Sequence, residues 1–302
     1  VLFRSLITGL IALVALSIFI FNRYKRSQEQ KKIIEEQKNL VVEKQTMIID
    51  SINYAKKIQD ALLNQEEHVR AMLPSHFIFY RPRDIVSGDF YWSLISDDAV
   101  FFAVADCTGH GVPGALMSVM GAALLSEIIN ERGVKDPAEA LNLLRLKVIT
   151  ALHGQHAVEQ MSGEEQLRDG MDIVLCRFEP ATRQLQFAGA NNPLWILRQG
   201  KMMEFEGDNF PVGLHHGAMK YFNSRSAELQ AGDEIFLFTD GFADQFGGPK
   251  EKKFGYRQMR DLFTSIHHYP MSIQKQKIEE VMNAWRGENE QVDDVLVVGI
   301  KL

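Results

Sequence analysis

The sequence predicts an α+β layered fold, in which two stacked β-sheets are flanked by helices and follow a long N-terminal helix. After Pro74 the chain consists of short apolar runs separated by Gly, Asp and Asn, a pattern typical of strands and turns. Runs such as 100–105 and 234–239 are mostly apolar on both alternating faces, so both faces of each sheet should be covered. Strands and helices come in blocks, which argues against a doubly wound parallel sheet.

Composition limits the class of protein. The 302 residues suffice for about two domains, and 46% of them are hydrophobic, enough for a substantial core. The formal net charge of −6 argues against nucleic acid as a partner, and we expect a protein partner. Cys107 and Cys176 lack the spacing of a disulfide framework or a zinc site, so a reducing, cytoplasmic setting is expected. Because the chain begins with Val1, we interpret it as the C-terminal part of a longer protein or as an excised fragment.

Residues 1–21 are predicted to form a transmembrane helix. The segment 6–21 is apolar and uncharged, and with the residues before it reaches the roughly 20 residues that a bilayer requires. Arg23, Lys25 and Arg26 follow directly, a positive-inside pattern that predicts a cytoplasmic membrane location with the rest of the chain in the cytoplasm. A signal peptide would need a cleavage site that is missing, and a buried core helix would not explain the basic cluster.

Residues 22–73 are predicted to form a cytoplasmic helical stalk. From Gln28 onward the segment contains no Gly or Pro before Pro74 and is rich in Glu, Gln and Lys. Apolar or semi-polar pairs recur every seven residues, at Ile33-Ile34, Leu40-Val41, Met47-Ile48, Tyr54-Ala55 and Ala61-Leu62. This repeat favours a left-handed coiled coil, and we expect a parallel homodimer through the stalk. A solvated amphipathic helix is the alternative, because the intervening positions are polar.

The strands and helices of the layered fold are expected within residues 74–302. Strands are predicted at 77–81, 89–95, 100–106, 172–179, 184–190, 194–198, 234–239 and 294–300. Helices are predicted at 113–130, 137–153, 255–265 and 272–285.

The segment from Asp89 to Asp106 predicts a β-hairpin that brings two carboxylates together. Two apolar runs flank Asp97-Asp98, which suits the centre of a two-residue turn. Pairing Ser96 with Ala99 sets Asp89 directly opposite Asp106, with Cβ atoms about 5 Å apart. Two like charges at that distance repel unless a cation lies between them, so the hairpin points to a divalent metal ion.

Further carboxylates stand at the ends of two other predicted strands. Asp240 ends the strand 234–239 and precedes Gly241, where the backbone can turn sharply. Asp293 and Asp294 stand at the start of the last strand. An oxygen-only ligand set suits Mg²⁺ or Mn²⁺ better than Zn²⁺ or Cu. Each Asp alone is an ordinary turn former, whereas the four sites together predict a metal centre.

A glycine-rich turn leads from this acidic set into a predicted helix. Gly109 and Gly111 let backbone amides approach, and Pro113 suits the first helical turn. Together with His110, this helix N-terminus is a candidate phosphate-binding element, because its amides carry a partial positive charge. The turn is neither a Walker A nor a dinucleotide motif, since no Lys-Ser/Thr follows and the Gly spacing differs.

Five sequence motifs follow one another between Pro74 and Leu302. They are DIVSGDFY at 84–91, ADCTGHGVPGA at 105–115, GANNP at 189–193, FTDGFAD at 238–244 and DDVLV at 293–297. In this order they resemble the bacterial phosphatases of the sporulation stage II protein E type, within the metal-dependent PPM superfamily. The resemblance implies that 74–302 is a PPM-type phosphatase domain, a four-layer α-β-β-α sandwich with two Mg²⁺ or Mn²⁺ ions at one edge.

The resemblance also implies roles for individual residues. The implied metal ligands are Asp89, Asp106, the carbonyl of Cys107, Asp240, Asp293 and Asp294. Asp89, Asp106 and Asp240 are the implied catalytic residues, and Asp293 aligns better than Asp294 with the last ligand. His110 is similar to a general acid of the eukaryotic branch, although its spacing from Asp106 is longer by two residues. The alternative, with equal weight, is that His110 is an ordinary polar loop residue. Asp172 is an accessory ligand or a residue at the start of a strand.

The implied reaction is metal-dependent hydrolysis of phosphoserine or phosphothreonine on a protein, by an activated water and without a phosphoenzyme. The implied substrate is a phosphorylated anti-sigma factor antagonist, with an upstream signal passed through the stalk. One alternative is a non-catalytic pseudophosphatase that binds a partner, although such a module has no need for four carboxylates. The other is a nucleotide cyclase, for which no triphosphate or base-recognition motif is present.

Overall fold

The computed structural model describes residues 2–63, 69–70, 73, 75–97, 99–154, 169–215 and 220–302. The chain divides into two compact units, Val1–Asn53 and Tyr54–Leu302. Helix α1 spans Leu2–Leu63 and runs through the predicted membrane segment and most of the predicted stalk. Residues 64–68 and 71–72, at the predicted end of the stalk, lie outside the described residues. Membrane crossing and pairing with a second copy stay predictions.

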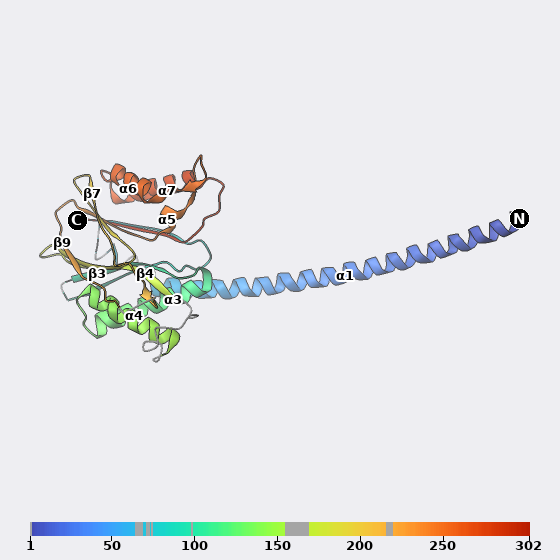
Figure 1. Ribbon diagram of the computed structural model, residues 1–302, viewed down its shortest axis with the longest axis horizontal. Helices are drawn as coiled ribbons and strands as arrows, with labels where there is room; N and C mark the ends of the chain where they lie inside the picture. Colours follow the sequence, from blue (N-terminus) through green and yellow to red (C-terminus); the bar gives the residue numbers. More distant parts are fainter. Residues whose placement is uncertain are drawn as a thin grey trace. The chain divides into compact units, whose positions relative to one another are not determined.

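Two antiparallel sheets form the centre of the second unit (Figure 1). The first sheet contains, in spatial order, β1 (His76–Arg81), β13 (Val295–Lys301), β10 (Glu234–Phe238), β6 (Leu194–Arg198) and β7 (Lys201–Phe205). The second sheet contains β2 (Phe90–Ser96), β3 (Ala99–Cys107), β4 (Gly170–Glu179), β5 (Gln184–Ala190) and β9 (Arg225–Glu228), with β8 (Val212–Gly213) paired to β4. A small ribbon is formed by β11 (Phe246–Gly247) and β12 (Lys252–Lys253).

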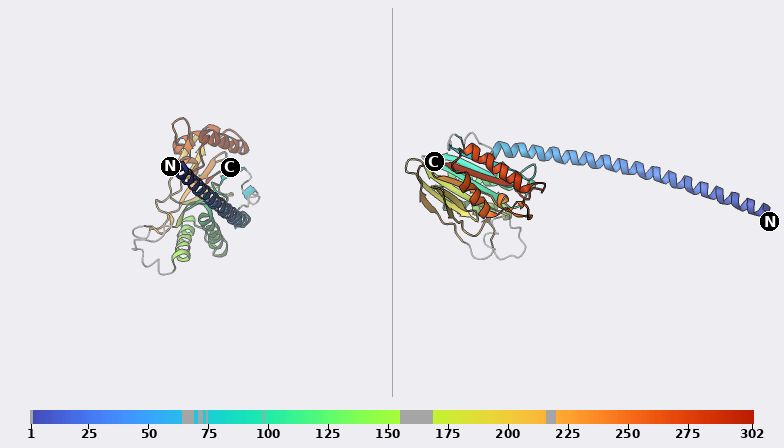
Figure 2. Two further views of the ribbon diagram at one scale, coloured as in Figure 1. Left: turned by 90° about the vertical axis from the view of Figure 1, so that its right-hand side faces the viewer. Right: turned by 90° about the horizontal axis from the view of Figure 1, so that it is seen from above.

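Helices cover the outer face of each sheet. The second sheet is covered by α3 (Gly111–Ser126), its π-helical continuation (Glu127–Glu131) and α4 (Pro137–His153). The first sheet is covered by α5 (Gly241–Asp244), α6 (Gly255–Ile266) and α7 (Met271–Arg286). In the view from above, α6 and α7 lie in front of the strands (Figure 2).

Three hydrophobic clusters fill the interfaces between these layers. The first joins α3 and α4 to the second sheet and contains Leu125 and Leu144. The next lies between the sheets, where Val174 of β4 and Ile196 of β6 are fully buried. The last joins α6 to the first sheet and includes Phe263. The three clusters thus separate four layers, a helical layer, two sheets and a second helical layer, which confirms the predicted α-β-β-α order of an α+β fold.

Most predicted elements are found with small shifts at their ends. β5, β6 and α4 have the predicted bounds, and the β2–β3 hairpin has the predicted register, with Ser96 opposite Ala99. The helix predicted at 113–130 begins two residues earlier, at Gly111. The edge strands β7 and β9 were missed, because β9 is mostly polar and exposed and charged residues in β7 interrupt its half-buried apolar residues, so neither shows a continuous apolar run.

Within the described part of the chain, one helical stretch, Gly111–Glu131, is long and apolar enough to cross a membrane. Half of its most apolar window is buried inside the fold, where it packs against the second sheet. Because length and composition are weak support for a span, we interpret this stretch as a core helix. Side chains of residues 2, 4, 5 and 8 lie outside the described set, so this finding does not extend to the predicted span 1–21.

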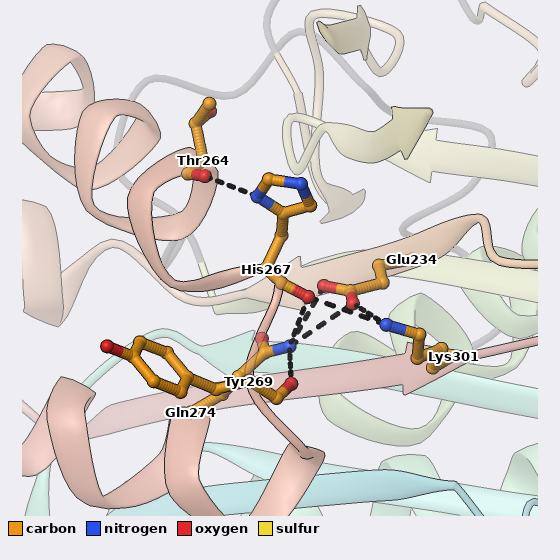
Figure 3. Close-up of polar contacts among 6 residues, drawn as sticks. All are labelled: Glu234, Thr264, His267, Tyr269, Gln274 and Lys301. Atoms are coloured by element: carbon orange, nitrogen blue, oxygen red, sulfur yellow. Dashed lines mark hydrogen bonds and ion pairs between the residues drawn. The ribbon is translucent and has the colours of Figure 1, made fainter. Parts of the chain in front are cut away.

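A buried carboxylate connects the segment between α6 and α7 to the ends of strands β10 and β13 (Figure 3). Glu234 is 1% exposed and accepts hydrogen bonds from Lys301 Nζ at 2.7 Å and from Gln274 Nε2 at 3.1 Å. The same amide nitrogen of Gln274 donates to the carbonyl of Tyr269 at 3.0 Å, and Lys301 Nζ lies 3.4 Å from the carbonyl of His267. A charge buried in this way is tolerated only while its partners remain.

Replacing Lys301 by Met should lower the free energy of unfolding by about 3 kcal/mol, because Glu234 keeps a buried charge without its cation. The double variant Glu234→Met with Lys301→Met should recover most of this loss, since neither charge remains. Urea unfolding of the unit Tyr54–Leu302 measures both values. Equal stability of the single variant and the wild type would contradict this account.

Candidate active site

The β2–β3 hairpin places Asp89 and Asp106 at one edge of the second sheet. Its ladder ends with Phe90 opposite Ala105, and the next residues in this register are Asp89 and Asp106. The turn residue Asp97 has a left-handed backbone with φ 52°, as suits a tight hairpin. Asp89 is buried, with 2% of its surface exposed, and Asp106 is partly buried.

A hydroxyl from the first sheet contacts this hairpin. Thr239 follows β10 and donates from Oγ1 to Asp89 Oδ2 at 2.6 Å. The same hydroxyl accepts the backbone N–H of Leu296 in β13 at 3.1 Å. Thr239 is buried, so its hydroxyl joins the two sheets at the acidic edge. Sequence reasoning quoted Thr239 within a motif and gave it no role, although its place before Asp240 at a strand end was a usable signal.

Asp172 belongs to the same edge. In the β3–β4 ladder it lies opposite Asp106, within the strand rather than at its start. Asn191 Nδ2 donates to Asp172 Oδ1 at 2.8 Å, and Asn192 Nδ2 donates to the carbonyl of Asp172 at 3.0 Å. Asn191 has φ 56°, a left-handed conformation that Asn tolerates better than most residues. The motif at 189–193 therefore orients one carboxylate, a role that sequence reasoning did not identify.

The first sheet supplies Asp240 and Asp293. Asp240 occupies the N-cap position of α5, after β10, and Asp293 lies just before β13. A Cβ on Gly241 would lie 1.9 Å from the carbonyl oxygen of Asp294, so only glycine permits this approach. Gly241 is needed for close packing of the two strand ends, not for a positive φ as a sharp turn would suggest.

Asp294 is used differently from Asp293. Its Oδ1 accepts the backbone N–H of Arg83 at 2.7 Å and its Oδ2 accepts that of Gly88 at 2.8 Å. Asp294 is buried, and both of its oxygens therefore hold the loop that leads into Asp89. Asp293 Oδ1 accepts the N–H of Asp294 at 2.8 Å, which leaves its other oxygen for a different partner.

These carboxylates destabilise one another's charged forms. Burial and then the charge of Asp106 raise the pKa of Asp89 well above its usual value, whereas the hydrogen bond from Thr239 lowers it. Burial, followed by the charges of Asp240 and Asp293, raises the pKa of Asp106 to about 8. Burial first, and then nearby carboxylates, raise the pKa of Asp240 to about 6. The acidic edge is therefore a place where a cation is favoured.

The chemistry of this donor set fits a hard divalent ion. Among the described residues, no three His, Cys, Asp or Glu side chains are gathered into a complete metal site by themselves. The available donors are all oxygens, from carboxylates whose ionised forms a cation would stabilise. Mg²⁺ and Mn²⁺ accept such ligands together with water, so an incomplete protein cage is compatible with either.

The backbone around Cys107 is packed against the loop before Asp89. A Cβ on Gly88 would lie 2.8 Å from the carbonyl oxygen of Gly109 and 3.1 Å from that of Cys107. The Cys107 side chain is buried, and burial raises the pKa of its thiol well above the usual value. A buried, neutral thiol is a poor nucleophile. Of Cys107, therefore, the main-chain carbonyl and not the thiol is the group that could act at this edge.

His110 lies at the N-terminus of α3, in the N-cap position, with Gly109 and Gly111 on either side. Its Nδ1 lies 2.9 Å from Asp84 Oδ2, and both side chains are largely exposed. Burial raises the pKa of Asp293, and the charge of His110 is among the groups that lower it. The structure therefore brings His110 towards the acidic edge and pairs it with a carboxylate that sequence reasoning had not considered.

Comparisons with known proteins agree with this fold. The family described as Stage II sporulation protein E (SpoIIE) matches residues 96–302. The SiaA-PP2C domain of Pseudomonas aeruginosa is 32% identical over 85% of this chain and 98% of its own, with a TM-score of 0.74.

Two further solved structures show the fold alone. The PP2C phosphatase domain of SpoIIE from Bacillus subtilis, with a regulatory fragment, is 20% identical over 76% of this chain and 63% of its own, with a TM-score of 0.59. The RsbU and RsbW domains of Rv1364c from Mycobacterium tuberculosis are 21% identical over 76% and 60%, with a TM-score of 0.59. The comparison with curated proteins gives no significant match.

In EDTA, the free energy of unfolding should fall as the pH rises from about 4 through 8. The folded-state pKa values of Asp106 and Asp240, about 8 and about 6, lie above their unfolded values, so the folded protein binds protons that the unfolded chain releases. Their stabilising contribution is complete below about pH 4 and is lost as the pH rises through the folded values. Mn²⁺ should stabilise the protein increasingly over the same range.

Denaturant unfolding at pH 5, 6.5 and 8 measures this effect, with Asp106→Asn as the comparison. In the variant, the slope of the unfolding free energy against pH should be smaller by up to about 1.4 kcal/mol per pH unit, which is the contribution of one proton. An equal slope for the variant and the wild type would show that Asp106 is not the titrating group.

Proposed function

We propose that this chain removes phosphate from a signalling protein of the anti-sigma factor antagonist type. The chain belongs to the Stage II sporulation protein E (SpoIIE) family and is a metal-dependent protein serine/threonine phosphatase. The observation that carries the proposal is the convergence of Asp89, Asp106 and Asp172 from one sheet with Asp240 and Asp293 from the other.

The carboxylates at this edge would hold two Mg²⁺ or Mn²⁺ ions. Asp89 and Asp106 are the proposed ligands nearest both ions, with the carbonyl of Cys107 as a further ligand. Asp240 and Asp293 are the proposed ligands of the second ion. When bound, such ions acidify a coordinated water and neutralise charge that develops on phosphoryl oxygens.

Asp294 is better suited to holding the loop than to binding metal. Both of its oxygens accept backbone N–H groups, which fix the loop 83–88 beside Asp89. Thr239 orients Asp89 and Asn191 orients Asp172 in the same manner. Hydrogen bonds of this kind set the direction of a carboxylate before it meets a cation.

The remaining groups at the edge suit the phosphoryl oxygens. The N-terminus of α3, at Gly109, His110 and Gly111, offers backbone amides and a partial positive charge to an anion. His110 is paired with Asp84, which would fix the orientation of its ring beside a bound phosphate. The buried thiol of Cys107 is poorly suited to form a cysteinyl phosphate, and we propose direct hydrolysis by water.

We further propose that the stalk controls this site. Gln59, near the end of α1 and within the second unit, is buried; its Nε2 donates to the carbonyl of Ser87 at 2.6 Å and to Ser118 Oγ at 2.9 Å. Its Oε1 accepts the N–H of Ser87 at 3.3 Å. One side chain therefore joins the helix to the loop before Asp89 and to α3.

The rest of α1 supports a membrane-anchored dimer as part of the proposal. Apart from the half-buried Ala55, the apolar pairs of the heptad repeat are exposed on the single chain, among them Ile34, Val41 and Ile48 at 60% or more. A coiled coil with a second copy would cover this stripe. The exposed apolar residues between Leu6 and Phe21 would be covered by a bilayer, with the catalytic unit in the cytoplasm.

Hydrolysis of p-nitrophenyl phosphate and of a phosphoserine peptide by the unit Tyr54–Leu302 should require Mn²⁺ or Mg²⁺ and stop in EDTA. Asp106→Ala and Asp240→Ala should each lower kcat/KM at least about 100-fold, because each removes a group that stabilises the reacting charge. Asp261→Ala, which removes an exposed carboxylate on α6, is the matched control and should change little. Absence of turnover with any metal ion would favour the pseudophosphatase alternative.

Replacing Gln59 by Ala should raise the Mn²⁺ concentration for half-maximal activity about tenfold, since the loop before Asp89 loses its contact with α1. Gln45→Ala, an exposed amide on the same helix, is the control. Steady-state rates across a Mn²⁺ titration of the full chain test this. A normal titration for the Gln59 variant would argue against stalk control through this contact.

A further inference from the structure

A pocket lies beside the acidic edge, between the β6–β7 hairpin and the first turn of α6. The residues that line it are Asn191, Pro193, Trp195, Glu204, Glu206, Gly207, Asn209 and Tyr256. Its volume is about 410 Å³, large enough for one long side chain. α6 contacts β7, so one wall belongs to the first sheet and the other to the helical layer that covers it (Figure 1).

One residue, Asn191, connects the pocket to the acidic edge. Asn191 lines the pocket and also donates to Asp172, which lies opposite Asp106 in the ladder. From the other wall, the phenol of Tyr256 has its pKa raised to about 12, first by burial and then by the charge of Asp240. The pocket therefore adjoins the acidic edge.

Of the two glutamates that line the pocket, one is paired with a cation and the other is not. Glu204 forms an ion pair with Arg260, and the Arg260 guanidinium stacks over the ring of Trp195 at 5.7 Å. Glu206 is exposed and makes no ion pair or hydrogen bond with a described residue. Trp195 is almost fully buried, whereas the ring of Tyr256 is 43% exposed. The pocket thus offers the ring of Tyr256 and the free carboxylate of Glu206, a combination that accommodates the stem and the cation of a Lys or Arg side chain.

We propose that this pocket is a specificity subsite that binds a Lys or Arg side chain next to the phosphorylated residue of the protein substrate. The inference rests on the proposed function, which it deepens by naming the substrate sequence that the site prefers. Glu206 pairs with the cation, the exposed ring of Tyr256 packs against its stem, and the amides of Asn191 and Asn209 face the peptide. An acidic neighbour of the phosphorylated residue meets repulsion from Glu206.

The test uses the full chain and two phosphoserine peptides that differ only in carrying Arg or Glu beside the phosphoserine. The wild type should hydrolyse the Arg peptide with about tenfold higher kcat/KM, and Glu206→Lys should abolish or invert this preference. Glu280→Lys, an equal change of charge at an exposed position of α7, should keep it. Because the readout is a ratio for two substrates of one enzyme, effects on the metal centre cancel.

Equal kcat/KM for the two peptides in the wild type, or a ratio that Glu206→Lys leaves unchanged, would overturn the inference. Turnover of p-nitrophenyl phosphate, which has no neighbouring residue, separates this failure from failure of the proposed function. If the wild type hydrolyses neither p-nitrophenyl phosphate nor the peptides, the phosphatase proposal fails, and fluorescence anisotropy of the two labelled peptides still decides the preference. Equal binding of both peptides would then overturn it.

Discussion

Repulsion between buried carboxylates is the constraint on which the rest of this structure depends. Asp89, Asp106 and Asp240 would lower the stability of any fold that placed them in a hydrophobic interior without partners. The fold holds them at one edge, where strand ends from both sheets meet. There Thr239 donates to Asp89, and burial, followed by the charges of neighbouring carboxylates, keeps the pKa of Asp106 high. Protons or cations must bind at this edge, and which of the two binds depends on pH and metal concentration.

The two sheets have to be stacked for this edge to exist. Neither sheet alone carries the whole set of carboxylates, because Asp89, Asp106 and Asp172 belong to one and Asp240 and Asp293 to the other. The hydrophobic cluster between the sheets fixes their separation. A change in that core should therefore alter the acidic edge even though the two do not share a residue.

Sequence reasoning went far for features that depend on local pattern. The β2–β3 register followed from one turn, because a two-residue loop at 97–98 leaves one pairing of the flanking strands. Features that depend on contacts between distant segments were out of reach. The role of Asn191 requires β4 and β5 to be paired, and the difference between Asp293 and Asp294 requires the loop 83–88 to pass beside β13. Adjacent aspartates have the same chemistry until their neighbours are known.

The loop 83–88 is the element through which α1 and the acidic edge are most directly joined. Asp294 holds this loop at Gly88, and Gln59 holds it one residue earlier, at Ser87. Asp89 follows immediately, so the two contacts on its N-terminal side determine where its carboxylate lies. A displacement of α1 by more than about half an ångström cannot be absorbed by the hydrogen bonds between Gln59 and Ser87, since their lengths are limited by geometry. The loop must either follow the helix, and move Asp89, or release it. This gives the proposed stalk control a definite physical form, a choice between two hydrogen-bonding arrangements rather than a gradual deformation.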